Sequence, residues 1–320
     1  MPESRLAQLS TSPLLKQFAI AASQKAIRPV GAFLLPLCDV PDITFRYKIY
    51  TDKNRYRVPD TRRQPGGKAT VIGFTADDQT ATLEPNALDF PIPNIDGLSE
   101  EALGYSIQEA QSTLADVSAL ALEQEQIQLA VTALNGAAAV FDYGNNSNDP
   151  IGNDTNGLDA VILQVALAAK NGAPVKVLFG TNAFRKFRNN TNVRGRIVVG
   201  GGRTAASGAV GSVALSIEDV GGLLLNNPQV MLSMMVIDSS AQGLAENISF
   251  LLDNSVIVFA GNDSPNRMDP SFGKTFARMG GFFKPGSYVT QDQRDEVLKM
   301  DWTTLPKITN SPAAKMIKMA

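Results

Sequence analysis

The sequence predicts an α+β fold, in which an extended hairpin and one long helix precede a compact unit of alternating strands and helices. Residues 43–50, "ITFRYKIY", alternate apolar and polar side chains, which is the period of a strand with one buried face. Residues 99–136 repeat apolar side chains every three or four positions, which is typical of a one-sided helix. From residue 175 onward, short apolar runs alternate with helical patterns, as in an α/β unit.

Composition narrows the possible functions. The 320 residues include no histidine, which excludes Ser-His-Asp and Cys-His catalysis and any imidazole metal ligand. Cys38, the single cysteine, excludes an internal disulfide and a thiolate zinc site, and it fits a reducing compartment. The apolar runs are too short for a transmembrane helix. The composition therefore disfavours an enzyme and predicts neither a cofactor nor a metal site.

Residues 1–42 predict an N-terminal arm rather than a domain. Pro29, Pro36 and Pro41 are expected to keep its second half extended. An amphipathic stretch precedes them, with an apolar stripe formed by Leu14, Leu15, Phe18 and Ala22.

Residues 43–98 predict a long hairpin. After the first strand, "RRQPGG" at 62–67 predicts a turn and "KATVIGF" at 68–74 predicts the returning strand. "LDFPIPNIDG" at 88–97 follows as a proline-rich exit. A two-stranded ribbon has little core of its own, so we expect it to pack on another part of the protein.

The long helix is predicted to begin after Ser99, a favourable N-cap, and to end at Gly136. One apolar stripe follows a spacing of four and three and then shifts around the helix. Its predicted members are Leu103, Ile107, Ala110, Leu114, Val117 and Ala121, followed by Leu120, Ile127, Val131 and Leu134. The absence of Lys and Arg excludes the usual ion pairs along the helix surface.

The remaining chain predicts the α/β unit. A helix over 158–172 precedes a strand at 175–180 and a helix over 181–190 capped by Thr181. Residues 196–216 predict a strand, a glycine-rich loop and a second strand. Further predictions are a helix at 216–226, strands at 229–238 and 255–261, and an extended segment over 282–320.

Charge is segregated along the chain, although the net charge is only −2. Residues 1–68 hold 12 basic and 5 acidic side chains, residues 69–169 hold 15 acidic and no basic ones, and residues 170–320 hold 17 basic and 11 acidic ones. The acidic third cannot satisfy its carboxylates internally. Two interpretations stay open: a solvated acidic face, or complementary surfaces on copies of one chain.

Three motifs suggest chemistry, and each has a simpler interpretation. "GGGRTAASGAVGS" at 200–212 lacks the lysine of a phosphate-binding loop, which favours a surface loop. The mixed aromatic and basic run at 45–63 is compatible with nucleic acid, but the acidic helix downstream favours protein–protein pairing. The carboxylates at 77–78 and 292–296 lack the ligand spacing of a calcium loop, so we interpret them as surface groups.

The segment "NSVIVFAGNDSPNRMDPSFGKTFAR" at 254–278 carries the most specific resemblance. Asn254, the apolar strand after it and a set of later residues resemble a stretch common in the major capsid proteins of tailed bacteriophages, with the Hong Kong 97-like fold. The later residues are Asp269, Pro270, Ser271, Phe272, Gly273, Thr275 and Phe276. "SIEDVGGLLLNNPQVMLSMMVID" at 216–238 and "LDFPIPNIDGLSEEA" at 88–102 are similar to neighbouring parts of that family.

This resemblance implies a domain organisation. Residues 1–42 would be the N-terminal arm, 43–98 the E-loop hairpin and 99–159 the peripheral domain with its spine helix. Residues 160–250 would form the axial domain, 251–300 the return strands and 301–320 the C-terminal segment. The segment 254–278 would connect domains, with its polar turn facing a neighbouring subunit. The scaffolding segment that many relatives carry before the arm is not expected here, and no covalent cross-link is predicted.

The resemblance also implies a function: a structural, non-catalytic protein that assembles into pentamers and hexamers around double-stranded DNA, in a virion assembled in the host cytoplasm. Portal, scaffolding or decoration proteins are possible partners, and no membrane is expected. The alternatives are a protein-packaging nanocompartment shell and a cytosolic enzyme acting on a phosphorylated ligand. The expected intersubunit contacts are the basic Arg46, Lys48, Lys53, Arg55, Arg57, Arg62, Arg63 and Lys68 against the acidic Glu100, Glu101, Glu109 and Asp116.

Overall fold

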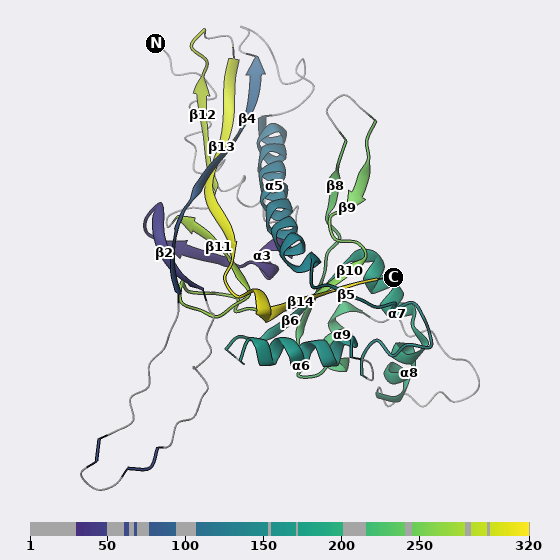
Figure 1. Ribbon diagram of the computed structural model, residues 1–320. Coiled ribbons are helices and arrows are strands. Elements are labelled where there is room, and N and C mark those ends of the chain that lie inside the picture. The colour runs from purple at the N-terminus through teal and green to yellow at the C-terminus, as the bar shows by residue number, and fades with distance from the viewer. Residues whose placement is uncertain are drawn as a thin grey trace.

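The computed structural model describes residues 30–49, 61–63, 67–68, 77–93, 107–152, 155–170, 172–200, 216–240, 245–278, 283–292 and 295–319. In Figure 1, a lower body surrounds a mixed sheet, and an elongated upper part rises from it beside one long helix, α5 (Ile107–Asn135). The C-terminus lies in the lower body, where the last strand joins the sheet.

The described elements before α5 are α3 (Val30–Leu34), β1 (Leu37–Val40), β2 (Thr44–Ile49), β3 (Asp77–Thr82) and β4 (Glu84–Pro93). Those from α5 to the middle of the chain are β5 (Ala139–Val140), α6 (Leu158–Ala168), β6 (Val175–Phe179), α7 (Thr181–Asn189), α8 (Thr191–Gly200) and α9 (Ile217–Leu223). The remaining ones are β7 (Gln229–Leu232), β8 (Val236–Asp238), β9 (Ile248–Phe250), β10 (Ser255–Ala260), β11 (Gly273–Arg278), β12 (Phe283–Val289), β13 (Asp295–Ile308), the 3-10 turn Ser311–Ala313 and β14 (Ala314–Lys318).

The sheet of the lower body has the order β5-β14-β10-β6-β7. Its central strands β14, β10 and β6 pair antiparallel, and β5 and β7 add in parallel at the two edges. All residues of β6 are buried, as are all but the first of β10. Such continuous apolar runs are typical of strands that are covered on both faces.

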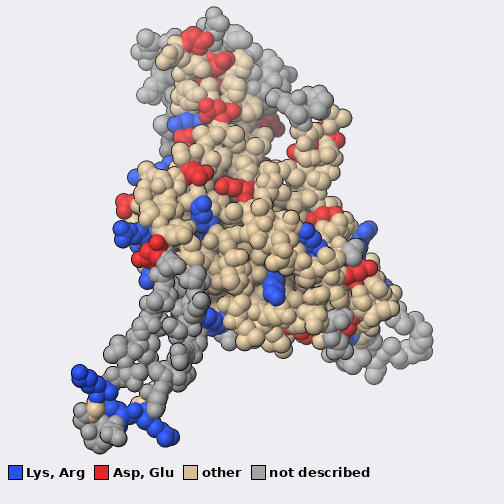
Figure 2. Space-filling model, viewed as in Figure 1, with Lys and Arg blue, Asp and Glu red and all other residues tan. Residues whose placement is uncertain are grey.

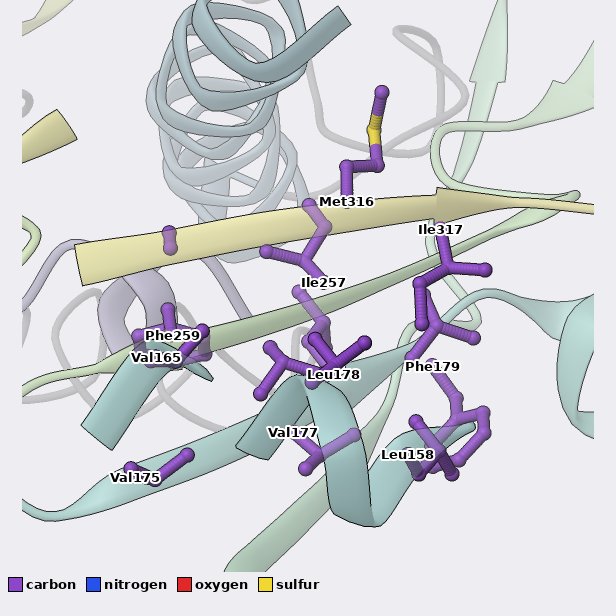
Figure 3. Packing of buried hydrophobic residues seen from close by; sticks show 14 of the residues in the cluster. Leu158, Val165, Val175, Val177, Leu178, Phe179, Ile257, Phe259, Met316 and Ile317 are labelled. Carbon is purple, nitrogen blue, oxygen red and sulfur yellow. The ribbon is translucent and has the colours of Figure 1, made fainter. Parts of the chain in front are cut away.

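Helices cover both faces of this sheet. The register places Met316, Ile257 and Leu178 on one face, and Figure 3 shows Met316 on the side of α5 and Val177 on the opposite side, near α6. Phe179 also belongs to that opposite face, where its ring meets Phe184 of α7 at 5.7 Å. Each fully buried aliphatic or aromatic side chain contributes roughly 1.5–3 kcal/mol, so this core stabilises the body.

The upper part is a second sheet organised around β13. β4 and β12 pair with the same stretch of β13, residues 296–302, and therefore lie on its two opposite edges. β11 pairs with residues 304–308 of β13 and joins β1 in parallel. β4 contains Pro85, Pro91 and Pro93. Proline has no backbone N–H, and an edge strand tolerates it because its outer side needs no donor for a further strand.

α5 packs on both sheets. Its first half contacts the upper sheet through a cluster of Ile92, Ala110, Leu114, Ala115, Leu298, Met300 and Trp302. Its second half contacts the lower body through Ile127, Ala130 and Leu134. The helix begins within the described residues at Ile107, so the predicted start at Ser99 lies outside them.

The predicted apolar stripe of α5 is correct only in part. Ala110, Leu114, Ile127 and Leu134 are buried, but Val117 is 47% exposed. Four polar side chains outside the predicted stripe are buried as well: Gln111, Ser118, Glu123 and Gln126.

Two of these polar side chains attach the N-terminal residues to α5. The Glu123 carboxylate accepts hydrogen bonds from the backbone N–H groups of Val30 and Gly31, at 3.1 and 3.2 Å. The Gln126 amide donates to Thr275 Oγ1 at 2.6 Å and to the carbonyl of Leu35 at 3.3 Å. Residues 30–34 are thus helical and part of the core, and the expectation that they are extended was wrong.

Three further local predictions were wrong. Residues 196–200, expected as a strand, end helix α8, because the Asn190 side chain accepts the N–H of Asn192 at 2.9 Å, the contact of a helix N-cap. The N-cap of α7 is Gly180 rather than Thr181, and the free N–H of Asn182 is accepted by Asp253 from another part of the chain. The expected strand over 229–238 divides into β7 and β8. The glycine-rich loop 201–215 lies outside the described residues.

Candidate intersubunit surfaces

The basic residues singled out in the hairpin are exposed or half-buried wherever the structure describes them. Arg46 and Lys48 lie on β2, where the exposed Arg46 alternates with the buried Phe45 and Tyr47. The short segments 61–63 and 67–68, which carry the exposed Arg62, Arg63 and Lys68, lie far from both sheets (Figure 1). Lys and Arg gather at this distal end in Figure 2. Lys53, Arg55 and Arg57 lie outside the described residues.

The base of this hairpin is fixed to the upper sheet. β2 pairs antiparallel with β3, Thr44 opposite Thr82 and Ile49 opposite Asp77, whereas the predicted returning strand at 68–74 falls mostly outside the described residues. The rings of Phe45 and Tyr47 lie 4.5 and 5.5 Å from that of Phe276 on β11. We expected the ribbon to pack on another part of the protein, and this aromatic contact confirms it for its base.

The acidic residues singled out that the structure describes, Glu109 and Asp116, lie on α5. Glu109 is exposed in its first turn, whereas Asp116 is half-buried, with Oδ1 enclosed and no hydrogen-bond partner. Burial raises the pKa of the Asp116 carboxyl, which makes it a poorer surface charge than Glu109. Glu100 and Glu101 lie outside the described residues.

Sequence reasoning missed other carboxylates at this end of the molecule. Asp89 on β4 is exposed, Asp301 on β13 is half-buried and pairs with Lys299 at 3.0 Å, and Figure 2 shows acidic side chains along the upper part. Asp89 accepts a hydrogen bond from the Tyr288 hydroxyl at 2.8 Å, across the face of the sheet. These carboxylates come together only through the pairing of β4 with β13, and no local pattern in the sequence predicts that pairing.

The basic and acidic surfaces lie at opposite ends of one molecule. The basic segments 61–63 and 67–68 project below the body, whereas α5 begins at the upper end (Figures 1 and 2). At about 1.5 Å per residue, the 29 residues of α5 alone span roughly 44 Å. These surfaces cannot pair within one copy, and their pairing requires a second one.

The segment 254–278 connects the two sheets, since β10 belongs to the lower sheet and β11 to the upper one. Its polar side chains bond to one another: the Asp269 carboxylate accepts from the Asn262 amide at 2.8 Å and from the Ser271 hydroxyl at 2.5 Å. Asp269 and Ser271 are buried. Asp269 and Ser271 thus fix the connection internally, whereas Asn266, Arg267 and Met268 of the same turn are exposed, and that the turn faces a neighbouring subunit stays a prediction.

Two buried lysines complete this connection. Lys274 donates to the carbonyls of Asn266 and Asp269, both at 2.6 Å, and burial lowers its pKa to about 8. Lys176 on β6 pairs with the exposed Asp263, and its ammonium lies 4.9 Å from the centre of the Phe33 ring. Both ammonium groups have partners within the fold, and these contacts account for the burial of the two lysines without a catalytic role.

The described residues give little support to a chemical site. No group of three or more His, Cys, Asp or Glu side chains among them could hold a metal ion. None of the described helices combines the length and the apolar character that a membrane span requires.

Comparison with known proteins relates this architecture to solved structures. No protein-family model matches the chain, and no curated protein sequence matches it. The structure is similar to a phage-related protein from Bordetella bronchiseptica RB50, with 16% identity, a TM-score of 0.63 and 96% of each chain covered.

Two assembled shells are also similar. The capsid of the cyanophage P-SCSP1u has 12% identity and a TM-score of 0.54 over 90% of this chain and 86% of its own. The SrpI encapsulin from Synechococcus elongatus PCC 7942 has 9% identity and a TM-score of 0.51 over 92% and 88%. The chain therefore has the Hong Kong 97-like capsid fold, which confirms the α+β class and the resemblance predicted from its sequence.

Proposed function

We propose that this chain is a major capsid protein, which assembles into pentamers and hexamers that form a closed shell around double-stranded DNA. The observation that carries the proposal is the similarity to a phage capsid structure and an encapsulin structure over at least 90% of this chain. Its role in this account is structural, and the buried lysines and carboxylates serve folding. The expected location is the virion, after assembly in the host cytoplasm.

A shell of identical subunits needs contacts in which one surface of the chain meets a different surface of its neighbour. The distal basic segments and the acidic upper end provide two such surfaces. In this account Arg62, Arg63 and Lys68 of one copy lie over Glu109 of the next. Lys53, Arg55 and Arg57 extend the basic surface and Glu100 and Glu101 the acidic one, whereas Arg46, Lys48 and the half-buried Asp116 contribute at the margins.

The energy of such pairing comes from repetition. A single exposed ion pair contributes only about 0–1 kcal/mol. Repeated around every ring of a shell, several pairs per subunit add up, and dissolved salt weakens each of them. Assembly by this mechanism is therefore sensitive to ionic strength.

The proposed domains follow the sequence boundaries. The arm comprises residues 1–42 and the E-loop 43–98; the peripheral domain combines 99–159 with 251–300. The axial domain comprises 160–250, and the segment 301–320 returns to the body, where β14 lies between β5 and β10. Portal, scaffolding or decoration proteins are further partners to be sought.

A second candidate is the shell of a protein-packaging nanocompartment, which the similarity to an encapsulin favours. The contents of purified shells distinguish the two. Shells of a capsid protein made during infection hold nuclease-protected double-stranded DNA, measured by absorbance and gel electrophoresis after nuclease treatment. Shells that contain a single protein cargo and no protected DNA would contradict the capsid proposal in favour of the nanocompartment.

A further inference from the structure

A groove runs between the second half of α5 and the β8–β9 hairpin. The hairpin rises beside α5 in Figure 1, and the groove has a volume of about 670 Å³. Its apolar lining includes Ile127 and Val131 from α5 and Ile237 and Leu251 from the hairpin, and most of the other lining residues are Gln, Ser and Thr. An apolar lining with a hydrogen-bonding rim suits an amphipathic peptide segment.

The groove lacks any cation among its lining residues, and its single charged one is Asp238. The Asp238 carboxylate accepts the N–H groups of Ser240 and Asn247, at 2.9 and 3.0 Å, and these bonds lower its pKa. Asp238 therefore keeps its negative charge in mild acid. In the sequence, α5 contains no Lys or Arg, and neither does the stretch 204–266 that includes the hairpin. The occupant that this surface favours is basic.

The chain that precedes Val30 starts at α5, the helix that forms one wall of this groove. Val30 is held by Glu123, one position before Gln124, which lines the groove. Twenty-nine residues lead to Val30, and at about 3.3 Å per residue they reach far beyond the width of one helix. They carry four basic side chains, Arg5, Lys16, Lys25 and Arg28, against the single acidic Glu3. Their apolar stripe is formed by Leu14, Leu15, Phe18 and Ala22.

We propose that the N-terminal segment, residues 1–29, docks in the groove between α5 and the β8–β9 hairpin. The apolar stripe covers Val131 and Ile237, and the basic side chains lie near Asp238. Docking gives a second layer to a hairpin that pairs with no other described strand, and an isolated two-stranded hairpin is marginal in water. This inference does not depend on shell formation, because one chain contains both the segment and the groove.

Amide hydrogen exchange of the full chain tests the docking. We compare the wild type with a Leu14→Glu/Phe18→Glu variant in the same assembled state, which light scattering establishes. The substituted residues are remote in sequence from the hairpin, so they affect it only through docking. We expect exchange at residues 236–239 and 248–251 to become about tenfold faster or more. A matched control is Leu167→Glu on α6, 75% exposed, which leaves that exchange unchanged.

A peptide of residues 1–28 then identifies the site. Added to the Leu14→Glu/Phe18→Glu chain, it restores the slow exchange, and it does so less at high salt; the same peptide with both glutamates does not. Unchanged exchange in the variant would overturn the proposal. A third chain carries Val131→Glu in addition to the two N-terminal substitutions. If the peptide slows exchange in this chain as much as in the double variant, the peptide binds elsewhere and the proposal is overturned.

Discussion

Buried polar side chains hold together segments that are distant in sequence. Asn190 is the clearest example, since its side-chain amide lies 3.0 Å from the carbonyls of Tyr143 and Asn145 and 3.4 Å from that of Asn148. Its carbonyl oxygen also accepts the N–H of Asn192 at the start of α8. One fully buried amide thus closes the loop after β5 and begins a helix.

Replacing Asn190 with Ala is expected to lower the free energy of unfolding by about 2–4 kcal/mol. The substitution leaves buried carbonyls without a donor and removes a helix cap, each at a cost of roughly 1–2 kcal/mol. Urea denaturation followed by circular dichroism measures the change. The matched control is Asn189→Ala at the exposed neighbouring position, expected within about 0.5 kcal/mol of the wild type. Equal effects of the two substitutions would contradict this role.

Glu123 gives the stability a pH dependence. Burial raises the pKa of its carboxyl from 4.5 to about 7. The folded state therefore keeps a proton that the unfolded state releases, and the free energy of unfolding falls as the pH rises from about 4.5 to 7. The shift corresponds to a loss of roughly 3 kcal/mol. Above pH 7 both states are ionised, and this contribution stays constant.

The Glu123→Gln variant is expected to lack this component. Its unfolding free energy, measured in urea at pH 5, 6, 7 and 8, should fall less than that of the wild type between pH 5 and 7. Glu109→Gln, at an exposed position of the same helix, should follow the wild type. Parallel curves for the wild type and Glu123→Gln would show that Glu123 is ionised throughout.

At the scale of the element, α5 has different partners along its length. Leu114 is buried against the upper sheet, whereas Val117, three residues later, is half exposed, although the sequence pattern assigned both to one apolar stripe. Leu114→Ala is expected to lower the free energy of unfolding by about 2–5 kcal/mol, the usual cost of a buried cavity. Val117→Ala should change it by about 0.5 kcal/mol or less. Chemical denaturation of both variants measures the two changes. Similar losses of unfolding free energy would contradict the described packing.

The elements best predicted from the sequence are those whose burial follows one simple period. β6 and β10 are continuous apolar runs, β2 alternates, and α5 has a helical spacing. α3 was missed because its five residues between prolines, four of them buried, show no period. The β-branched residues at 197–199 predicted a strand, but the cap at Asn190 starts a helix there. Tertiary contacts decided both cases.

The candidate surfaces were predictable to different degrees. The basic residues of the hairpin stand out in the sequence because charges on an exposed loop need no partners in the fold. The acidic upper end was found in part, since Asp89 and Asp301 come to lie on neighbouring strands only through the pairing of β4 and β13, which sets Asp89 opposite Lys299 and Asp301 opposite Ala87. The groove could not be predicted from the sequence, because its two walls come from residues 124–132 and 237–251, which are far apart along the chain.

At the scale of the whole molecule, the separation of charge predicts how copies recognise each other. Arg62→Glu/Arg63→Glu should leave the chain folded, with an unchanged circular dichroism spectrum, and abolish assembly, because the basic end would then repel the acidic end of a neighbour. Arg185→Glu/Arg188→Glu makes the same change of charge at exposed positions of α7 and is the matched control, expected to assemble. Adding Glu109→Lys to the first variant should restore assembly in part.

The most direct measurement is size-exclusion chromatography with light scattering and negative-stain microscopy, on the wild type and on Arg62→Glu/Arg63→Glu, at low and high salt. The account predicts shells, or rings of five or six, for the wild type at low salt, their dispersal at high salt, and folded single chains for the variant. A wild type that remains a 34.2 kDa monomer at every salt concentration, or a variant that assembles as readily as the wild type, would contradict it.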